Sequence, residues 1–193
     1  MPRGDDVLAA AIRHLNADPT ASMAAIAAAI GISRATLHRH YATREALLHA
    51  LGDRAIARWA ESMDSAGIDA AAASGDPARL AAALDALLRA YVVDADEHGF
   101  ALTDHFVAHL PDLVERGEAL EEREIAFYAA CRRAGVLRAD LPARWMSNAV
   151  YGLMVAVRDS LRHGDVARRD VADLLVGTLL HGAGGPAREG GRP

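Results

Sequence analysis

The feature that most constrains the fold is a tight turn between two short helical stretches near the N-terminus. Residues 23–30 read MAAIAAAI, with apolar residues recurring on one helix face. Gly31 follows, and a residue without a Cβ readily takes the left-handed conformation that ends a helix. Ser33 then offers a capping hydroxyl to a second helix over residues 34–41. Two helices joined so closely predict a helix-turn-helix pair.

The remainder of the chain also favours helix. Aromatic residues make up only 5% of the sequence, alanine is abundant, and extended β-branched runs are missing. We expect an all-α fold of about nine helices. Small residues over 65–77 predict a linker, and the His98–Phe100 stretch predicts a break. Helical spacing of apolar residues predicts the other helices over residues 6–16, 43–65, 77–97, a shorter segment ending at 110, 111–133, 142–163 and 167–181.

Charge and cysteine content limit the function classes. The formal net charge is −5, which argues against a chain that coats nucleic acid along its whole length. The first 50 residues hold five arginines against four acids, so any anion-binding surface is expected there. The lone Cys131 excludes an intramolecular disulfide and a cysteine-based metal cage. No apolar run approaches the roughly 20 residues of a membrane span, so we expect a cytoplasmic protein with no membrane partner.

The second helix of the pair carries candidate contacts to DNA. Its N-terminal half is expected to enter a major groove, where Arg34 can pair with guanine and Thr36 can contact thymine. Hydroxyls and arginines near helix N-termini are candidates for phosphate contacts, although Arg39 and Arg44 are equally typical of ordinary surface positions. The candidate DNA-binding residues are Thr20, Ser22, Ser33, Arg34, Ala35, Thr36, His38, Arg39, Thr43 and Arg44.

The run SMAAIAAAIGISRATLHRHYATREALL closely resembles the N-terminal domain of the TetR family of bacterial transcriptional regulators. His38 stands where that family usually has tyrosine, and we expect it to strengthen operator binding at acid pH, when its charge is gained. The resemblance implies a helix-turn-helix domain over residues 1–45 and a helical ligand-binding and dimerisation domain over 46–181. A glycine-rich, disordered tail is expected over 182–193. The resemblance to the TetR family further implies a homodimer, most simply a repressor, that binds a palindromic operator and is released by a small-molecule effector.

Two sets of residues in the second domain are candidates for the effector pocket and for dimerisation. Side chains with bulk and a polar tip are candidates for the pocket, and their small number favours an apolar or aromatic effector. They are Tyr91, Phe100, His105, His109, Phe127, Tyr128, Trp145, Met146 and Tyr151. The resemblance also implies that the last two helices pair with those of a second subunit, so residues on their apolar faces are candidates for the dimer interface. They are Val150, Leu153, Met154, Val157, Leu174, Leu175, Thr178 and Leu179. Packing of both sets within one chain is the alternative.

An alternative function is an all-α enzyme or a metal-dependent binding protein. His105 and His109 are four residues apart, a spacing that can chelate a metal, but no further ligand is fixed by the sequence. No nucleophile with a base beside it is apparent, nor a glycine-rich loop that could cradle a phosphate. We therefore expect no enzyme activity, no metal and no cofactor.

Overall fold

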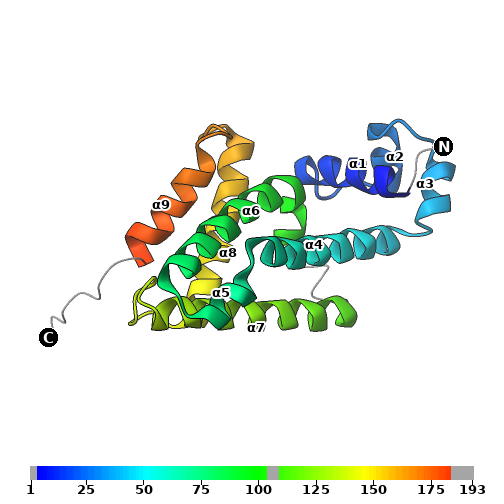
Figure 1. Cartoon of the computed structure of the whole chain (residues 1–193). Coiled ribbons are helices and arrows are strands. Elements are labelled where there is room, and N and C mark those ends of the chain that lie inside the picture. The colour runs from blue at the N-terminus through cyan, green and yellow to red at the C-terminus, as the bar shows by residue number, and fades with distance from the viewer. Residues whose placement is uncertain (1–3, 104–108, 184–193) are drawn as a thin grey trace, which may run out of the picture.

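The computed structural model describes residues 4–103 and 109–183, and within these ranges the chain is built from helices without a strand (Figure 1). The all-α prediction is confirmed. The described helices are α1 (Gly4–Ala17), α2 (Met23–Ala29), α3 (Arg34–His40), α4 (Arg44–Ala66), α5 (Ile68–Ser74), α6 (Pro77–Thr103), α7 (Pro111–Arg133), α8 (Ala143–His163) and α9 (Val171–Ala183).

A first hydrophobic core joins α1, α2, α3 and the start of α4. Ile26 and Leu37 of the helix-turn-helix pair are fully buried in it, together with Leu47 of α4. Gly31 has a φ of 74°, so the turn between α2 and α3 uses the left-handed conformation that glycine adopts without strain. The first core therefore holds α3 at one end of the molecule, far from α9 (Figure 1).

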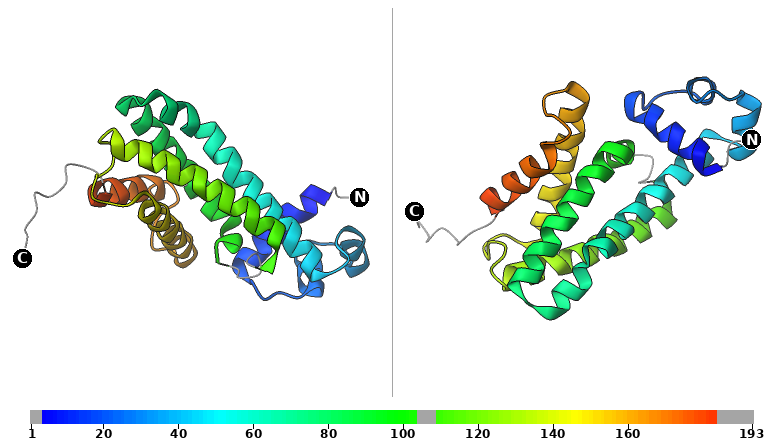
Figure 2. Two further views of the ribbon diagram at one scale, coloured as in Figure 1. Left: turned by 90° about the horizontal axis from the view of Figure 1, so that it is seen from below. Right: turned by 45° about the horizontal axis from the view of Figure 1, so that its top comes forward.

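A second hydrophobic core fills the helical body around α6. This helix contacts α1, α4, α5, α7, α8 and α9, and its residues Leu84, Leu87 and Leu88 are almost completely buried. The two further views show α7 lying alongside α4 and α8 (Figure 2). The helix α4 belongs to both parts, because its first turns pack in the first core and Met63 packs in the second.

The segment expected to be a linker contains a helix, so that prediction was wrong. α5 occupies residues 68–74, and it buries Ile68 and Ala71 against the body. Gly67, with a φ of 66°, ends α4 and starts α5 in a single residue. The run of alanines has a high helix propensity, and tertiary packing of two side chains is enough to order it.

The predicted break at His98 is a kink inside a longer helix. His98 has a φ of −121° and a ψ of 18°, but α6 continues to Thr103. The carbonyl oxygen of Gly99, just after the kink, accepts a 3.1 Å hydrogen bond from Nη1 of Arg158. A Cβ at Gly99 would lie 2.5 Å from Cδ of Arg158, so this close approach requires glycine. The predicted separate segment ending at 110 is thus partly the end of α6, and residues 104–108 of it lie outside the described residues.

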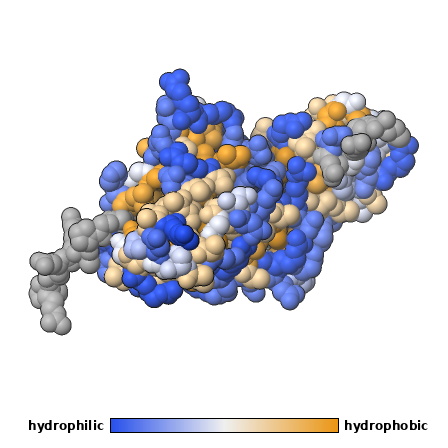
Figure 3. All heavy atoms as spheres, viewed as in Figure 1, coloured by the Kyte–Doolittle hydropathy of each residue, from blue (hydrophilic) through white to orange (hydrophobic). Residues whose placement is uncertain are grey.

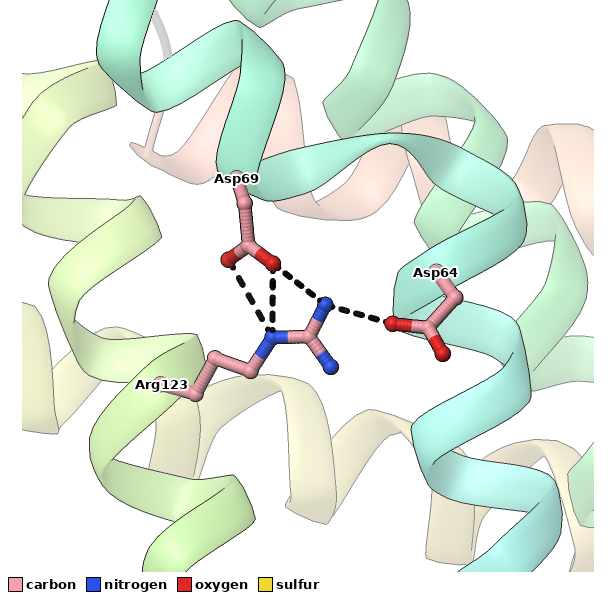
Figure 4. Close-up of polar contacts among 3 residues, drawn as sticks. All are labelled: Asp64, Asp69 and Arg123. Carbon is pink, nitrogen blue, oxygen red and sulfur yellow. Dashed lines mark hydrogen bonds and ion pairs between the residues drawn. The ribbon is translucent and has the colours of Figure 1, made fainter.

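Side-chain contacts join the helix-turn-helix part to the helical body and also join helices within that body. Nδ2 of Asn16 in α1 donates to the carbonyl oxygen of Glu97 at 2.9 Å, beside the kink of α6. On the opposite side, the guanidinium of Arg123 in α7 bonds both carboxylate oxygens of Asp69 and also reaches Asp64 (Figure 4). The ion pair therefore links α4, α5 and α7.

The domain boundary and the start of the last helix differ from those predicted from the sequence. The predicted boundary after residue 45 falls in the first turn of α4, and Leu47, Leu48 and Leu51 beyond it still pack in the first core. The last helix starts at Val171 rather than at 167, because a turn precedes it. Residues 184–193 of the predicted tail lie outside the described residues. Over the described ranges, every helix is too short or too polar to cross a bilayer.

Candidate functional site

Three hydroxyl side chains cap the starts of α2, α3 and α4. Oγ of Ser22 accepts from the Ala25 amide at 3.2 Å, and Oγ of Ser33 accepts from the Thr36 amide at 3.0 Å. Oγ1 of Thr43 accepts from the Ala46 amide at 3.1 Å. Each cap satisfies an amide that would otherwise lack a partner at the start of its helix. The caps therefore stabilise the starts of α2, α3 and α4.

Leu37 anchors α3 to the first core, and the opposite face is open to solvent. Arg34, Ala35 and Arg39 are exposed, whereas Thr36 and His38 are half-buried. Nε of Arg34 donates to Nε2 of His38 at 3.2 Å, and Nδ1 of His38 lies 3.0 Å from the carbonyl oxygen of Ala42. Arg34 and His38 therefore act as a hydrogen-bonded pair on the surface that was predicted to contact DNA.

Two of the predicted phosphate contacts are engaged within the protein. Arg44 donates from Nη1 to the carbonyl oxygen of Ala21 and from Nη2 to that of Pro19, at 3.2 and 2.9 Å. Oγ1 of Thr20 donates to Asp18 at 2.8 Å. These bonds brace the loop between α1 and α2. The geometry gives Arg44 a structural role that the sequence did not indicate, and its contact with phosphate stays a prediction.

A cavity of about 410 Å³ opens in the helical body between α4, α6, α7 and α8. We call it the acid-lined cavity. Its lining includes the aromatic residues Trp59, Tyr91 and Tyr151, the cationic Arg58, and the acids Asp94, Glu118, Glu121 and Glu124. Asp94 pairs with Arg58, and Glu121 pairs with Arg144 outside the lining. Glu118 and Glu124 therefore give this cavity its negative character.

Glu124 is the most buried of these acids, with 3% of its surface exposed. Its Oε1 accepts hydrogen bonds from the hydroxyls of Tyr91 at 2.5 Å and Tyr128 at 3.2 Å, and its Oε2 accepts from Ser147 at 2.6 Å. Burial raises the pKa of Glu124, although the three hydroxyl donors oppose that rise. Nε1 of Trp59 donates to the Tyr91 hydroxyl at 2.8 Å, which extends this chain of hydrogen bonds to α4.

The sequence identified only part of this lining. Of the residues predicted for the pocket, Tyr91 and Tyr151 line the cavity. Phe127, Tyr128 and Met146 are buried in the core and do not line it. Trp145 and His109 are exposed and lie outside the lining. His105 and the side chain of Phe100 lie outside the described residues. Glu124 was missed, although it shares the apolar helix face of Phe127, Tyr128 and Cys131, and a carboxylate in such a stripe is a detectable signal.

The predicted dimer residues divide into three groups by burial. Val150, Val157, Leu175 and Leu179 are buried within their own chain, and Leu153 and Met154 are half-buried. Leu174, at 53% exposure, and Thr178 face solvent on α9. Trp145 on α8 is 60% exposed although it was assigned to the pocket. The available apolar surface of the last two helices is therefore smaller than predicted, and it includes Trp145.

Residues 7–51 match the model for bacterial regulatory proteins of the tetR family. The transcriptional repressor LfrR of Mycolicibacterium smegmatis is 30% identical over 179 residues, which cover 91% of this chain and 87% of LfrR. This chain belongs to the TetR family. It is a DNA-binding transcriptional regulator and not an enzyme.

Further relatives agree with the family. The transcriptional regulator NfxB of Pseudomonas aeruginosa is 27% identical over 176 residues, which cover 88% of each chain. The crystal structure of LfrR in complex with proflavine matches this regulator with a TM-score of 0.70 at 26% identity, over 91% of this chain and 93% of that one. AibR in complex with isovaleryl coenzyme A and operator DNA shares the fold, with a TM-score of 0.70 at 19% identity, over 92% of this chain and 97% of that one.

The alternative based on a metal site is not supported by the family. His109 is exposed in a short turn before α7, and its predicted partner His105 lies outside the described residues. In the ranges that the structure describes, no three His, Cys, Asp or Glu side chains gather in a way that could hold a metal ion.

Cys131 is buried, and burial raises the pKa of its thiol to about 12, so it is not a reactive thiolate at neutral pH.

Proposed function

We propose that this regulator is a homodimeric repressor whose binding to a palindromic operator is weakened by a small aromatic cation in the acid-lined cavity. The observation that carries the proposal is the course of α4. Thr43 caps the start of this helix beside α3, and Trp59, about four turns further along, borders the cavity. A ligand that displaces Trp59 therefore acts on the same rigid element that ends at the DNA-binding surface.

The lining of the cavity defines the class of effector. Its volume of about 410 Å³ is in the range that encloses a small organic molecule. Trp59, Tyr91 and Tyr151 offer ring faces, and cations bind such faces as well as carboxylates. The sequence predicted an apolar or aromatic effector, and the acids add a positive charge to that description. The relative LfrR, which is named a repressor and was crystallised with proflavine, supports both parts of the proposal.

Effector binding is tested first without DNA, using proflavine, a planar aromatic cation, as the probe. Glu124→Gln removes the most buried negative charge, so we expect proflavine to bind this variant about tenfold more weakly than the wild type, or about 1.4 kcal/mol. Glu115→Gln is the matched control, because Glu115 is an exposed acid of α7 outside the cavity lining. Fluorescence titration measures both. Equal affinities of the two variants would rule out the cavity as the cation site.

Operator release needs its own control, because proflavine also stacks between base pairs of free DNA. A palindrome selected from a random duplex library serves as the operator, and fluorescence anisotropy follows the complex. We expect proflavine to dissociate the wild-type protein from the operator at concentrations that leave the complex of Glu124→Gln with the operator intact. If both complexes dissociate together, the ligand acts on the DNA and the proposed release mechanism is wrong.

The DNA-contact residues are proposed to lie on the exposed face of α3. Arg34→Ala and Thr36→Ala are expected to weaken operator binding by about 1–3 kcal/mol each if they read base edges. Arg79→Ala, an exposed arginine on α6, is the control for loss of one positive charge. Unchanged binding by both α3 variants would show that another surface contacts the operator.

For the homodimer we propose an interface that includes Trp145 of α8 and Leu174 of α9. Both side chains are more than half exposed in the single chain, which is unusual for large apolar residues. Hydrophobic residues reach the surface over α6 and α9 on the face drawn in Figure 3. Sedimentation of Trp145→Glu and Leu174→Glu is expected to show monomers, whereas Val93→Glu, at an apolar α6 position that is 47% exposed, stays dimeric. The reverse pattern would move the interface to α6.

A further inference from the structure

A second cavity of about 630 Å³ lies where α1 of the helix-turn-helix part meets α4, α6 and α8. We call it the arginine cleft. Five arginines line it, whereas only two acids, Asp96 and Glu97, do so. The arginines come from four different segments and are Arg13 of α1, Arg54 of α4, Arg158 and Arg162 of α8, and Arg168 of the turn before α9. This excess of positive charge contrasts with the net charge of −5 of the whole chain.

The two acids do not neutralise the cleft. Asp96 forms an ion pair with Arg168, and Arg158 is held by Asp159 and by the Gly99 carbonyl oxygen. Over the residues that the structure describes, no hydrogen bond or ion pair engages the side chains of Arg13, Arg54 or Arg162. Three guanidinium groups from three helices therefore face one cleft, with Glu97 as the remaining carboxylate in its lining.

Two buried polar atoms of residues that line the cleft also lack a partner. They are Nε of Arg54 and Nδ1 of His98, which has only 7% of its surface exposed. Buried donors without a partner are costly, and they commonly mark a place that a ligand or an ordered water fills. Burial lowers the pKa of His98, and Arg54 and Arg58 add to this effect against Asp94 and Glu97. The neutral imidazole can still donate one N–H to an anion.

We propose that the arginine cleft binds a small phosphate-bearing anion that bridges α1 to the helical body. Guanidinium groups match the oxygens of a phosphate in paired hydrogen bonds, and several of them together favour a group with more than one negative charge. The volume exceeds that of a single phosphate, so a diphosphate or a phosphorylated small molecule fits. Because Arg13 belongs to α1 and Arg162 to α8, one ligand contacts both parts of the molecule.

This site is distinct from the acid-lined cavity, but the two share a wall. His98 at the kink of α6 borders both cavities, and Asn16 of α1 bonds the Glu97 carbonyl oxygen beside it. An anion held between α1 and α8 fixes the position of the helix-turn-helix part relative to the body. Its binding therefore changes the affinity for the operator, in addition to any effect of a ligand in the acid-lined cavity.

Inorganic pyrophosphate, titrated calorimetrically into DNA-free protein at fixed ionic strength, tests the site. We expect one site per chain in the wild type and at least tenfold weaker binding to the double variant Arg13→Ala, Arg162→Ala. Both side chains are exposed and form no hydrogen bond or ion pair within the described residues, so the variant is expected to melt at the wild-type temperature. Arg169→Ala is the matched control, because this exposed arginine follows Arg168 but does not line the cleft.

The results separate the cleft from the DNA-binding surface. Pyrophosphate binding that is unchanged in the double variant, or absent from the wild type, overturns the proposal. Binding that is lost in Arg34→Ala instead places the anion on α3 and also overturns it. In a second measurement, pyrophosphate is expected to change operator affinity severalfold for the wild type and Arg169→Ala but not for the double variant. An equal change in all three proteins would show that the anion does not act as a bridge.

Discussion

The hydroxyl of Tyr91 donates a 2.5 Å hydrogen bond to the carboxylate of Glu124, at a site where α6 and α7 are otherwise joined by apolar packing. Both side chains are almost completely buried, and both also border the acid-lined cavity. Trp59 donates to the same Tyr91 hydroxyl. The Glu124 carboxylate is therefore connected, through two hydrogen bonds, to α4, the helix that begins beside the proposed DNA-binding surface.

Glu124 is expected to make folding stability depend on pH. Burial raises its pKa in the folded state above the ordinary carboxyl value of about 4.3. A raised pKa means that the folded protein binds the proton more tightly than the unfolded chain does, so protonation of Glu124 stabilises the fold. This stabilisation is complete below the pKa of the unfolded chain and is lost as the pH rises through the pKa of the folded protein. The uncharged Glu124→Gln variant has no such loss. Its stability relative to the wild type is expected to increase between about pH 4 and neutral pH.

Urea unfolding at several pH values measures this difference directly. Glu115→Gln serves again as the control, because its carboxylate is exposed on the same helix. A stability difference for Glu124→Gln that stays constant with pH would contradict a raised pKa at this position.

Asn16 is expected to stabilise the junction between α1 and α6. Its side-chain amide donates to the carbonyl oxygens of Glu97 at 2.9 Å and Asp96 at 3.4 Å, next to the kink at His98. Asn16→Ala removes these bonds and is expected to cost about 1 kcal/mol of unfolding free energy. Asn148→Ala, an exposed asparagine of α8, should cost much less. Equal losses would show that the contact with α6 contributes nothing specific.

The pair of Arg34 and His38 predicts how operator binding responds to pH. Because Nε2 of His38 accepts from Arg34, a proton added to that nitrogen breaks the bond and frees the guanidinium for DNA. Operator affinity is therefore expected to be higher near pH 6 than near pH 8, and His38→Tyr should abolish the difference. His163→Gln, an exposed histidine at the end of α8, should retain it. Anisotropy titrations at the two pH values decide between these outcomes.

The ion pair of Arg123 with Asp69 and Asp64 is expected to contribute modestly to stability. The Arg123 side chain is 26% exposed, whereas the two carboxylates are about two-thirds exposed, so water screens much of the attraction. Hydrogen bonding to Asp69 raises the pKa of Arg123, so the pair stays charged across the working range. Arg123→Met is expected to lower the unfolding free energy by at most about 1 kcal/mol. A loss that persists unchanged in high salt would point to packing instead of charge.

Local chemistry was sufficient to predict the helix-turn-helix part. Gly31, Ser22, Ser33 and Thr43 act within three or four residues of their own positions, so the turn and the three caps could be read directly from the sequence. The apolar spacing that buries Leu37 is likewise a property of one helix. The resemblance to the TetR family rests on the same short segment, and the comparisons confirm it.

Only the tertiary structure decided where the cavities lie and what lines them. Trp59, Tyr91 and Glu124 come from three helices, and nothing in the order of the sequence indicates that they share hydrogen bonds. The same holds for Arg13 and Arg162, which are 149 residues apart in the sequence but border one cleft. Helix periodicity identifies an inner face, but it does not say which other helix that face will meet. The sequence alone therefore determined the helix-turn-helix motif and most of the helices, whereas long-range packing determined α5 and the position of both cavities, because such contacts depend on how whole helices cross.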